Sequence, residues 1–460
     1  MRSENYVMKK KFKLKLSTTQ LILSSFLLAI LIGSLLLTLP ISSATGERVG
    51  YIDSLFTATT ATCVTGLVTL PTAHTWSIFG QIIILILIQI GGLGIINVMA
   101  YLMIALNRRM GLRDTYLVGD AFNLNSHSGI SKFLKKVVIG TFTVEGVGAL
   151  LYMIAFIPEF GTRGIWISVF TSISAFCNAG IDVIGTNSLC SYATNTFINA
   201  VTSALIITGG IGYIVWWDVI RVFRQRKKLG KRIFSHLSLH SKMAISMTVA
   251  LLFGGAIGIL LLEYNNPETL GAYSLFDKIQ VSLFQSITTR TAGFASIPQE
   301  NLGGASVMLC LILMFIGGSP VGTAGGVKTV TILVLLSTMR SVVKNKNEVS
   351  IFGRNLSHEA IKKAVAVSVM SLTIMLISTI LLLCTTSAPL IDVLYETVSA
   401  TATVGLTRNL TPSLNVYGKL IIIATMYLGR IGPISIAIAF ASSKAITNNI
   451  KNPTEEISVG

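Results

Sequence analysis

The chain has 460 residues, of which 52% are hydrophobic and only 12% are charged, against roughly 25% charged residues in an ordinary soluble domain. Its net charge of +17 comes from 36 Lys and Arg against 19 Asp and Glu. Several apolar runs reach the ~20 residues needed to cross a ~30 Å hydrocarbon core. The composition therefore excludes a soluble globular protein and predicts a multi-pass membrane protein.

The basic residues gather in five segments, namely the first 15 residues, 108–136, 221–242, 340–363 and the residues after 441. They alternate with segments poor in Lys and Arg, which is the pattern of a chain with both termini in the cytoplasm. We therefore expect a protein of the cell membrane. The run 21–39 followed by Ser42, Ser43 and Ala44 also permits a cleaved secretory signal, but cleavage would break the repeat described next.

Four similar stretches recur along the chain, each beginning with an aromatic residue and ending with glycine. They are Phe56–Gly66, Phe170–Gly180, Phe284–Gly293 and Tyr395–Gly405. The glycines are 114, 113 and 112 residues apart, so four copies of one unit account for nearly the whole chain.

Within each copy an apolar span precedes the glycine stretch and a second apolar span follows it. The first spans are expected at 20–39, 137–157, 243–262 and 364–385, and the second at 78–105, 196–220, 305–338 and 417–441. The stretch between them is too short to cross a bilayer, so it must be re-entrant or extramembrane.

The predicted fold is an all-α membrane protein with eight transmembrane helices in four helix–pore loop–helix repeats. Two spans per repeat is an even number, so the repeats are parallel and permit pseudo-fourfold symmetry around a central pore. Many transporters are instead built from inverted repeats. The expected segments are a cytosolic N-terminus at 1–19, repeats at 20–110, 111–230, 231–345 and 346–445 with pore loops 52–67, 165–182, 277–294 and 391–406, and a cytosolic tail at 446–460.

The repeated loop is suited to ion coordination. A short helix followed by a glycine-centred turn, repeated around an axis, would direct backbone carbonyls inward, where they can replace the hydration shell of a cation. None of the residues concerned is ionisable, which favours a monovalent cation over an anion or a divalent cation. The alternative is that four small-residue loops merely pack helices together. The candidate ion-binding residues are Val64, Thr65, Gly66, Asn178, Ala179, Gly180, Thr291, Ala292, Gly293, Thr403, Val404 and Gly405.

These loops also carry a family resemblance, together with a glycine-rich segment in the third copy. The segments are Ala61–Leu67, Thr288–Phe294, Tyr395–Leu406 and Gly317–Gly326. The chain resembles the ion-translocating subunit of the bacterial Ktr and Trk potassium uptake systems, a superfamily that includes the plant HKT transporters. With eight predicted spans it is closer to the Ktr-type (KtrB-like) subunit.

The resemblance implies a homodimer in which each subunit holds its own pore. It also implies a cytosolic RCK-type ring (KtrA/KtrC-like) that binds ATP or ADP, and potassium uptake stimulated by sodium. In this superfamily a serine at the first filter position often accompanies sodium selectivity, so Gly66 supports potassium. A sodium or non-selective transporter of the same superfamily, and an alternating-access carrier, remain alternatives.

The second spans share a glycine signature, Gly91–Gly94, Gly209–Gly212, Gly317–Pro320 and Gly429–Gly432. Glycine pairs there permit kinking or act as a packing surface. The third copy has five glycines and a proline between 317 and 326, so we expect its helix to break and form a gating loop. The gate residues are Gly317, Gly318, Ser319, Pro320, Gly322, Thr323, Gly325, Gly326 and Arg430.

Several charges fall within predicted membrane segments. Arg430 lies near the middle of its span, where arginine costs ~2.5–3.5 kcal/mol, so we expect it to face the pore or the loop as an electrostatic barrier. Lys328 either anchors the loop or points toward cytosolic water, and we favour water. Arg290 and Glu396 are expected to pair with each other or with loop carbonyls.

The remaining acidic residues are given mainly structural roles. Asp53, Asp277 and Asp392 precede three pore helices and suit helix caps, whereas Asp182 could collect cations at an outer mouth. The five cysteines and five histidines show no metal-ligand or catalytic spacing, so neither a metal centre nor an enzyme is expected. No nucleic-acid binding is expected, because the basic segments lack interleaved aromatic residues. The basic loops suit a regulatory subunit or anionic lipid.

Overall fold

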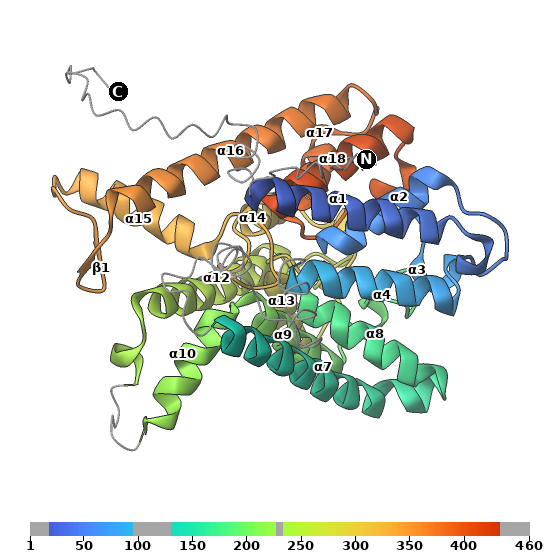
Figure 1. The fold of residues 1–460 in the computed structure, drawn as a ribbon, viewed down its shortest axis with the longest axis horizontal. Coiled ribbons are helices and arrows are strands. Elements are labelled where there is room, and N and C mark those ends of the chain that lie inside the picture. The colour runs from blue at the N-terminus through green and yellow to red at the C-terminus, as the bar shows by residue number, and fades with distance from the viewer. Residues whose placement is uncertain (1–17, 95–129, 227–232, 433–460) are drawn as a thin grey trace, which may run out of the picture.

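The computed structural model describes residues 18–94, 130–226 and 233–432, and all statements below concern those ranges (Figure 1). The predicted cytosolic tail, nearly all of the predicted N-terminal segment, and the ends of the second spans at 95–105 and 433–441 lie outside the described residues. The helices are α1 Thr18–Leu37, α2 Tyr51–Cys63, α3 Thr72–Thr75, α4 Ile78–Leu93, α7 Ile130–Phe160, α8 Arg163–Cys177, α9 Thr196–Gly210, α10 Tyr213–Arg224, α12 Leu239–Glu263, α13 Leu275–Thr288, α14 Gly304–Phe315, α15 Thr329–Val343, α16 His358–Leu383, α17 Leu390–Ala402 and α18 Val416–Ile431.

Short 3₁₀ turns and one hairpin complete the described structure. The turns are η1 Pro40–Ser42, η2 Cys190–Tyr192, η3 Phe234–His236, η4 Gln299–Asn301 and η5 Thr411–Ser413. The hairpin consists of β1 Ser350–Ile351 and β2 Arg354–Asn355, which pair antiparallel between α15 and α16.

Four helices in the described ranges, α1, α7, α12 and α16, are long and apolar enough to cross a membrane. They overlap the four predicted first spans. Each exposes large apolar side chains to its surroundings, such as Leu28, Ile154, Leu261 and Ile380, which are 58%, 66%, 72% and 61% exposed. Such exposure would be unfavourable in water, so these faces suit contact with lipid.

Where the structure describes the second spans, none of them is one continuous helix, whereas the sequence led us to expect a full break only in the third. Among the described residues only α9 and α10 pass as a spanning pair, and they are bent by 98°. The α4, α14 and α15 helices have 16, 12 and 15 residues. Counted by length and composition, the described residues contain four spans, or five with the bent pair. Parts of the second spans lie outside those residues, so the eight-span architecture stays a prediction.

Contacts between helices run around a closed circuit. We call α1, α2 and α4 the first unit, α7 to α10 the second, α12 to α15 the third and α16 to α18 the fourth. The short helix of each unit packs against its own long helix and against a helix of the preceding unit. These contacts between units are α2 with α18, α8 with α4, α13 with α9 and α17 with α14. The first and fourth units therefore touch, and the ring closes.

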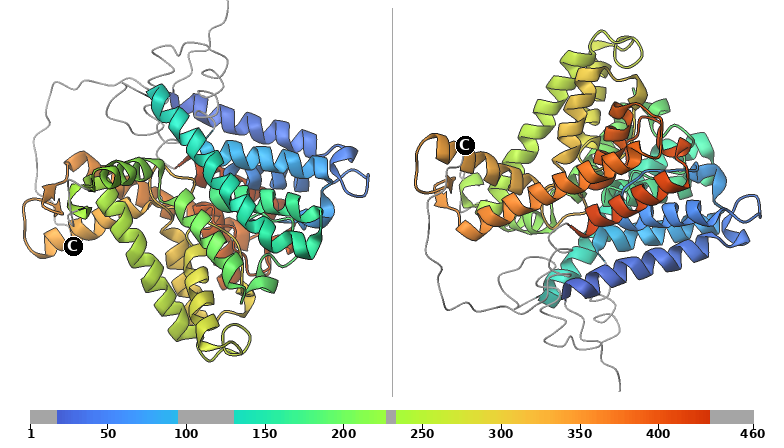
Figure 2. Two further views of the ribbon diagram at one scale, coloured as in Figure 1. Left: turned by 90° about the horizontal axis from the view of Figure 1, so that it is seen from below. Right: turned by 90° about the horizontal axis from the view of Figure 1, so that it is seen from above.

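The short helices α2, α8, α13 and α17 occupy the interior. In α2 every residue from Phe56 to Cys63 is buried, although six of these eight residues are threonine or alanine. In both views of Figure 2 the first unit, coloured blue, and α12 of the third unit, coloured yellow-green, extend to different sides of the molecule. The backbones of the glycines that follow the four short helices lie against one another, so the C-terminal ends of these helices converge where the predicted loops begin.

Candidate functional site

The four predicted tripeptides share one backbone conformation. The residue two positions before each glycine is left-handed, with φ of 54° at Val64, 58° at Asn178, 68° at Thr291 and 51° at Thr403. The glycines also have positive φ, of 99°, 63°, 81° and 96° in chain order. Successive residues of a regular strand face opposite sides, so left-handed residues at alternate positions turn neighbouring carbonyl groups toward the same side.

Glycine is required at the ends of these tripeptides. The φ values at Gly66 and Gly405 lie beyond the range of about +50° to +70° that other residues reach. A Cβ built on Gly66 would lie 2.6 Å from the carbonyl oxygen of Ala179 in the second unit. The same relation continues around the molecule: Gly180 faces the carbonyl of Ala292, Gly293 that of Val404, and Gly405 that of Thr65. The four glycines therefore form a closed ring, and backbone alone fits at its centre.

A hydroxyl group on each short helix supports the tripeptide that follows it. The Thr60 hydroxyl accepts from the Gly66 amide at 2.9 Å, and the Ser399 hydroxyl accepts from the Gly405 amide at 3.0 Å. Ser174 accepts from the Ile181 amide at 3.1 Å, whereas Thr288 donates to the Phe294 carbonyl at 2.6 Å. Sequence reasoning missed these four residues, although each lies five or six positions before its glycine in the repeated stretches.

The segment between α14 and α15 lies directly against the glycine ring. We call residues 316–328 the intramembrane loop. Its Gly325 amide donates to the Thr291 hydroxyl at 3.2 Å, and its Thr323 hydroxyl donates to the Phe176 carbonyl at 3.1 Å. The second span of the third unit is thus broken where the glycine-rich sequence predicted. The loop formed at this break connects the third unit with the end of α8.

Carbonyl groups at the end of α9 also hold this loop. The amides of Ser319 and Thr323 donate to Gly210 and Gly209 at 2.9 and 3.2 Å. These carbonyls are free because α9 ends at Gly210 instead of continuing. The broken second helix of one unit therefore binds the broken second helix of the next.

Helix breaks are common to the second spans, whereas sequence reasoning allowed kinking in all copies but expected a full break only in the third. Gly94, Gly212 and Gly432 follow α4, α9 and α18, with φ of 82°, 95° and 90°. They occupy the same place in their repeats, at the end of the shared glycine signature. We expected kinking or a packing surface at the other glycine pairs and a full break only in the third copy, because that copy has five glycines and a proline within ten residues. A glycine with strongly positive φ is sufficient to end a helix, since it lies outside the α region.

Arg430 connects three units at this level. Its guanidinium donates to the Thr323 carbonyl of the intramembrane loop at 2.7 Å and to the Gly91 carbonyl of α4 at 2.6 Å. Both acceptors are neutral carbonyl groups, and Arg430 forms no ion pair with an acidic side chain among the described residues. Arg430 therefore places a positive charge beside the loop while fixing the loop to the first unit.

Two other cations within the membrane segments also bind loop carbonyls. Lys328 donates to the Ala324 and Gly325 carbonyls at 2.6 and 3.3 Å, so our preference for cytosolic water was wrong and the anchoring role is the one observed. Arg290 donates to the Gly317 carbonyl at 3.3 Å. It does not pair with Glu396.

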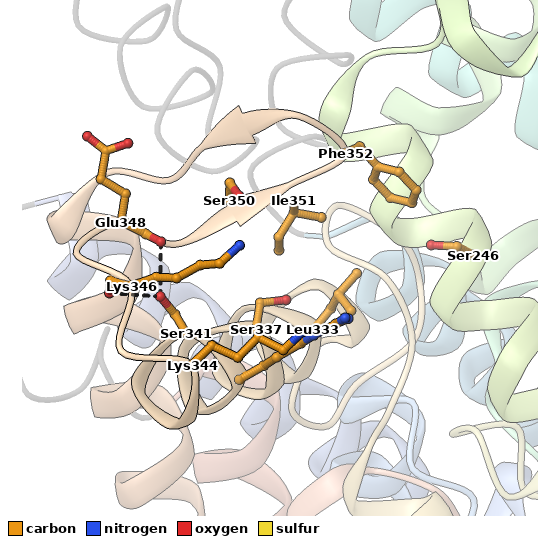
Figure 3. A pocket seen from close by; sticks show the side chains of 11 residues that line it. Ser246, Leu333, Ser337, Ser341, Lys344, Lys346, Glu348, Ser350, Ile351 and Phe352 are labelled. Carbon is orange, nitrogen blue, oxygen red and sulfur yellow. Dashed lines mark hydrogen bonds between the residues drawn. The ribbon is translucent and has the colours of Figure 1, made fainter.

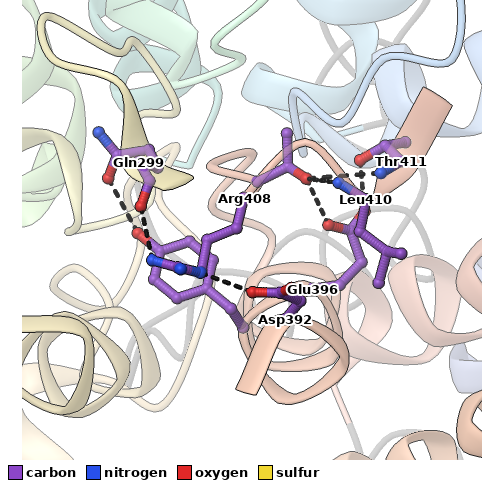
Figure 4. Close-up of polar contacts among 8 residues, drawn as sticks. Gln299, Asp392, Glu396, Arg408, Leu410 and Thr411 are labelled. Atoms are coloured by element: carbon purple, nitrogen blue, oxygen red, sulfur yellow. Dashed lines mark hydrogen bonds and ion pairs between the residues drawn. The ribbon is translucent and has the colours of Figure 1, made fainter. Parts of the chain in front are cut away.

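Glu396 instead belongs to a polar network with residues that follow the fourth tripeptide in the sequence (Figure 4). Its carboxylate accepts from the Thr407 hydroxyl at 2.6 Å and also from Thr411. Nearby, Arg408 donates to Asp392 at 2.7 Å and to the Gln299 carbonyl of the third unit at 2.8 Å. The chain that leaves the fourth tripeptide is thereby tied to α17 and to the third unit.

The predicted aspartate caps need correction. Asp53, Asp277 and Asp392 lie in the first turns of α2, α13 and α17, but the N-cap residues are Gly50, Ser274 and Pro389. Asp53 accepts from Lys419 of the fourth unit at 2.6 Å, which links the ring where it closes. Each aspartate keeps a favourable position in the first turn of its helix. The cation that pairs with Asp53 is far away in the sequence, so sequence spacing does not reveal it. Asp182 is half-buried and accepts from the Ile184 amide at 3.2 Å.

Comparison with known proteins identifies first the class and then the family. The fold is similar to the crystal structure of the potassium transporter TrkH from Vibrio parahaemolyticus, with a TM-score of 0.72 over 94% of this chain and 86% of that one, at 16% identity. The chain therefore has the fold of that membrane protein. The profile of the TrkH family, described as cation transport protein, matches residues 5–449. The chain belongs to this family of cation transporters.

Full-length relatives agree with that assignment. The chain is 38% identical to the potassium/sodium uptake protein NtpJ of Enterococcus hirae, over 99% of this chain and all of that protein. It is also 38% identical to the Ktr system potassium uptake protein B of Bacillus subtilis, over 96% of each. These matches confirm the resemblance to the Ktr and Trk systems, and membership in a transporter family confirms that the chain is not an enzyme.

Proposed function

We propose that this protein mediates potassium uptake through a selectivity filter formed by the four tripeptides that end at Gly66, Gly180, Gly293 and Gly405. The observation that carries this proposal is the closed ring, in which each glycine faces the carbonyl oxygen of the next unit. Carbonyl oxygens held around one axis can replace the water around an alkali metal ion. In addition, the buried hydroxyl oxygens of Thr65 and Thr403 have no partner among the described residues, so they are available to an ion.

Potassium is favoured over sodium as the transported ion. The similarity to a potassium uptake protein of a Ktr system supports potassium, and the resemblance to the superfamily associates glycine at position 66 with potassium. The name of the other relative, a potassium/sodium uptake protein, keeps sodium as a second candidate. It also agrees with the proposal that sodium stimulates uptake.

The architecture proposed for this activity is four parallel repeats with pseudo-fourfold symmetry in the cell membrane, with both termini in the cytosol. The circuit of contacts between α2, α8, α13, α17 and their neighbours supports it. Eight passages of the membrane follow if each broken second helix, together with the residues after it, counts as one passage.

The proposed gate consists of the intramembrane loop, including 317–326, and Arg430. The loop contacts the filter through Thr291, and Arg430 binds the loop at Thr323. A positive charge beside a cation path opposes the passage of cations. Moving the loop away from the filter would require breaking its hydrogen bonds with the carbonyls of α9 and with Arg430.

Partners are proposed from the relatives. Two Bacillus subtilis relatives are named as proteins B and D of Ktr systems, and such names imply a further subunit. We propose a homodimer bound to a cytosolic RCK-type ring that carries ATP or ADP. Potassium is the substrate and sodium the activator, and no cofactor is attached covalently.

The experiment that tests the function is ion uptake into liposomes containing the purified full-length protein. We expect uptake of K⁺ to exceed uptake of Na⁺ at equal gradients. Equal entry of both ions would refute the potassium assignment, and faster Na⁺ entry would support the second candidate. Single-channel currents would favour a continuous pore, whereas coupled flux without such currents would favour an alternating-access carrier.

A further inference from the structure

A pocket separate from the proposed ion path lies beside the β1–β2 hairpin (Figure 3). Its volume is about 320 Å³, and its walls come from the C-terminal half of α15, from residues 344–352 that follow it, and from Ser246 of α12. Neither the transport mechanism nor the comparisons assign it a role. The volume is sufficient for a phosphate group with part of its attached alcohol.

The lining of the pocket is cationic. Arg340, Lys344 and Lys346 contribute three positive charges, against one carboxylate from Glu348. None of the three cations forms an ion pair with another described residue. Figure 3 shows the Lys346 side chain extending into the space between helix and hairpin, whereas the Glu348 carboxylate turns outward and accepts from the side chain of Asn355.

The end of α15 does not oppose an anion strongly, although a helix C-terminus carries partial negative charge. Three of its carbonyls accept from backbone amides that follow the helix: Arg340 and Val342 accept from residues 344 and 345, and Ser341 accepts from Lys346 at 2.9 Å. The Ser341 hydroxyl donates to the carbonyls of residues 346 and 348, which holds the wall in shape. The net field in the pocket is therefore set by its three cations.

An apolar surface adjoins this cationic pocket. Met339, Val342 and Val343 of α15 are 60%, 73% and 80% exposed. The ring of Phe352, which also lines the pocket, packs edge to face on Phe234 with centroids 6.0 Å apart. A free phosphate would gain nothing from these side chains, whereas an acyl chain would remove them from water.

The position along the membrane spans also suits a lipid headgroup. Ser246 is the eighth residue of α12 and the fourth after Lys242, the last charged residue before the apolar part of that span, so it lies about 6 Å beyond that charge at 1.5 Å per residue. The interfacial region on each side of the hydrocarbon core is several ångströms deep. The pocket thus opens near the depth at which phosphates of a bilayer lie, on the side where the basic loops gather.

We infer that this pocket binds the phosphate of an anionic phospholipid such as phosphatidylglycerol, while the exposed apolar residues of α15 contact its acyl chains. Arg340, Lys344 and Lys346 bind the phosphate, and Ser337 and Ser350 contribute hydroxyl groups. Basic pockets between membrane helices recognise such headgroups. This inference does not depend on the identity of the transported ion.

The test compares lipid binding by two charge-matched variants of the full-length protein. The first carries Arg340→Gln, Lys344→Gln and Lys346→Gln, which removes the three pocket cations. The control carries Arg354→Gln, Lys362→Gln and Lys363→Gln, which removes three exposed charges near the pocket but outside its lining. Retention of dioctanoyl phosphatidylglycerol and of dioctanoyl phosphatidylcholine is measured by native mass spectrometry in detergent. As a check on folding, both variants should elute from a size-exclusion column at the same volume as the wild type.

We expect the wild type and the control to retain phosphatidylglycerol, and the pocket variant to bind it at least tenfold more weakly. Higher salt should weaken the wild-type interaction. Equal retention by the pocket variant, or equal retention of phosphatidylcholine by the wild type, would overturn the inference. Inorganic phosphate that displaces the lipid at equal concentration would identify a free-phosphate site instead. Unchanged lipid binding with loss of a co-purifying cytosolic subunit would show that the surface docks a protein.

Discussion

Substituting Gly66 by alanine tests the central geometry most directly. The new Cβ would lie 2.6 Å from the Ala179 carbonyl oxygen and 3.2 and 3.3 Å from the Cα atoms of Gly405 and Gly180. An ordinary carbon–oxygen contact is about 3.3 Å or longer. The Ala179 carbonyl or the Gly66 backbone must therefore move by roughly 0.7 Å, and the movement displaces one of the oxygens proposed to bind the ion.

The energetic consequence follows from two contributions. Alanine at a left-handed φ costs about 1–2 kcal/mol, and φ of 99° is less favourable than the usual left-handed region. Overpacking of a dense site costs typically 1–3 kcal/mol more. If only ~1.4 kcal/mol of this total reaches the bound ion, potassium affinity falls tenfold.

We therefore expect Gly66→Ala to lower the ratio of K⁺ to Na⁺ uptake in liposomes by at least tenfold. Gly254→Ala is the matched control, because an added Cβ there meets nothing within 4 Å on a span that faces outward. The control should transport as the wild type does. A Gly66→Ala protein that elutes normally and retains the wild-type K⁺ to Na⁺ ratio would refute the carbonyl-ring argument.

Three further substitutions address the gate and the support of the filter. Arg430→Ala should raise K⁺ flux in liposomes, because it removes both a positive charge and the contacts with Thr323 and Gly91; unchanged flux would exclude its role as a barrier. Lys328→Met, which keeps chain length but loses the donors to the loop carbonyls, should raise flux in the same assay, and a decrease would contradict an anchoring role. Thr60→Val should lower the free energy of unfolding by about 1–3 kcal/mol, because it leaves a buried amide without its acceptor, and it should also reduce the K⁺ to Na⁺ uptake ratio. The control Thr143→Val, on an exposed face of α7, should change neither quantity. Equal behaviour of the two variants would mean that the Gly66 amide does not need its hydroxyl partner.

Local sequence determined the parts of this protein that depend on neighbouring residues. Apolar composition marked the long helices, because a span needs about 20 apolar residues in succession. The repeated glycines marked the loops, because a left-handed turn at a crowded axis excludes side chains. The break between α14 and α15 followed from five glycines and a proline in ten residues.

Tertiary structure decided which distant groups meet. Asp53 pairs with Lys419, 366 residues away, and Arg430 binds Gly91 at a separation of 339 residues, so no local spacing could indicate either contact. Lys328 binds carbonyls only three and four residues before it, but this contact depends on the course of the broken loop, which the local sequence did not indicate. The break after α9 likewise depends on packing. A glycine pair allows a helix to continue or to end, and the amides of Ser319 and Thr323 in the third unit, which bind the freed carbonyls of Gly210 and Gly209, favour the end.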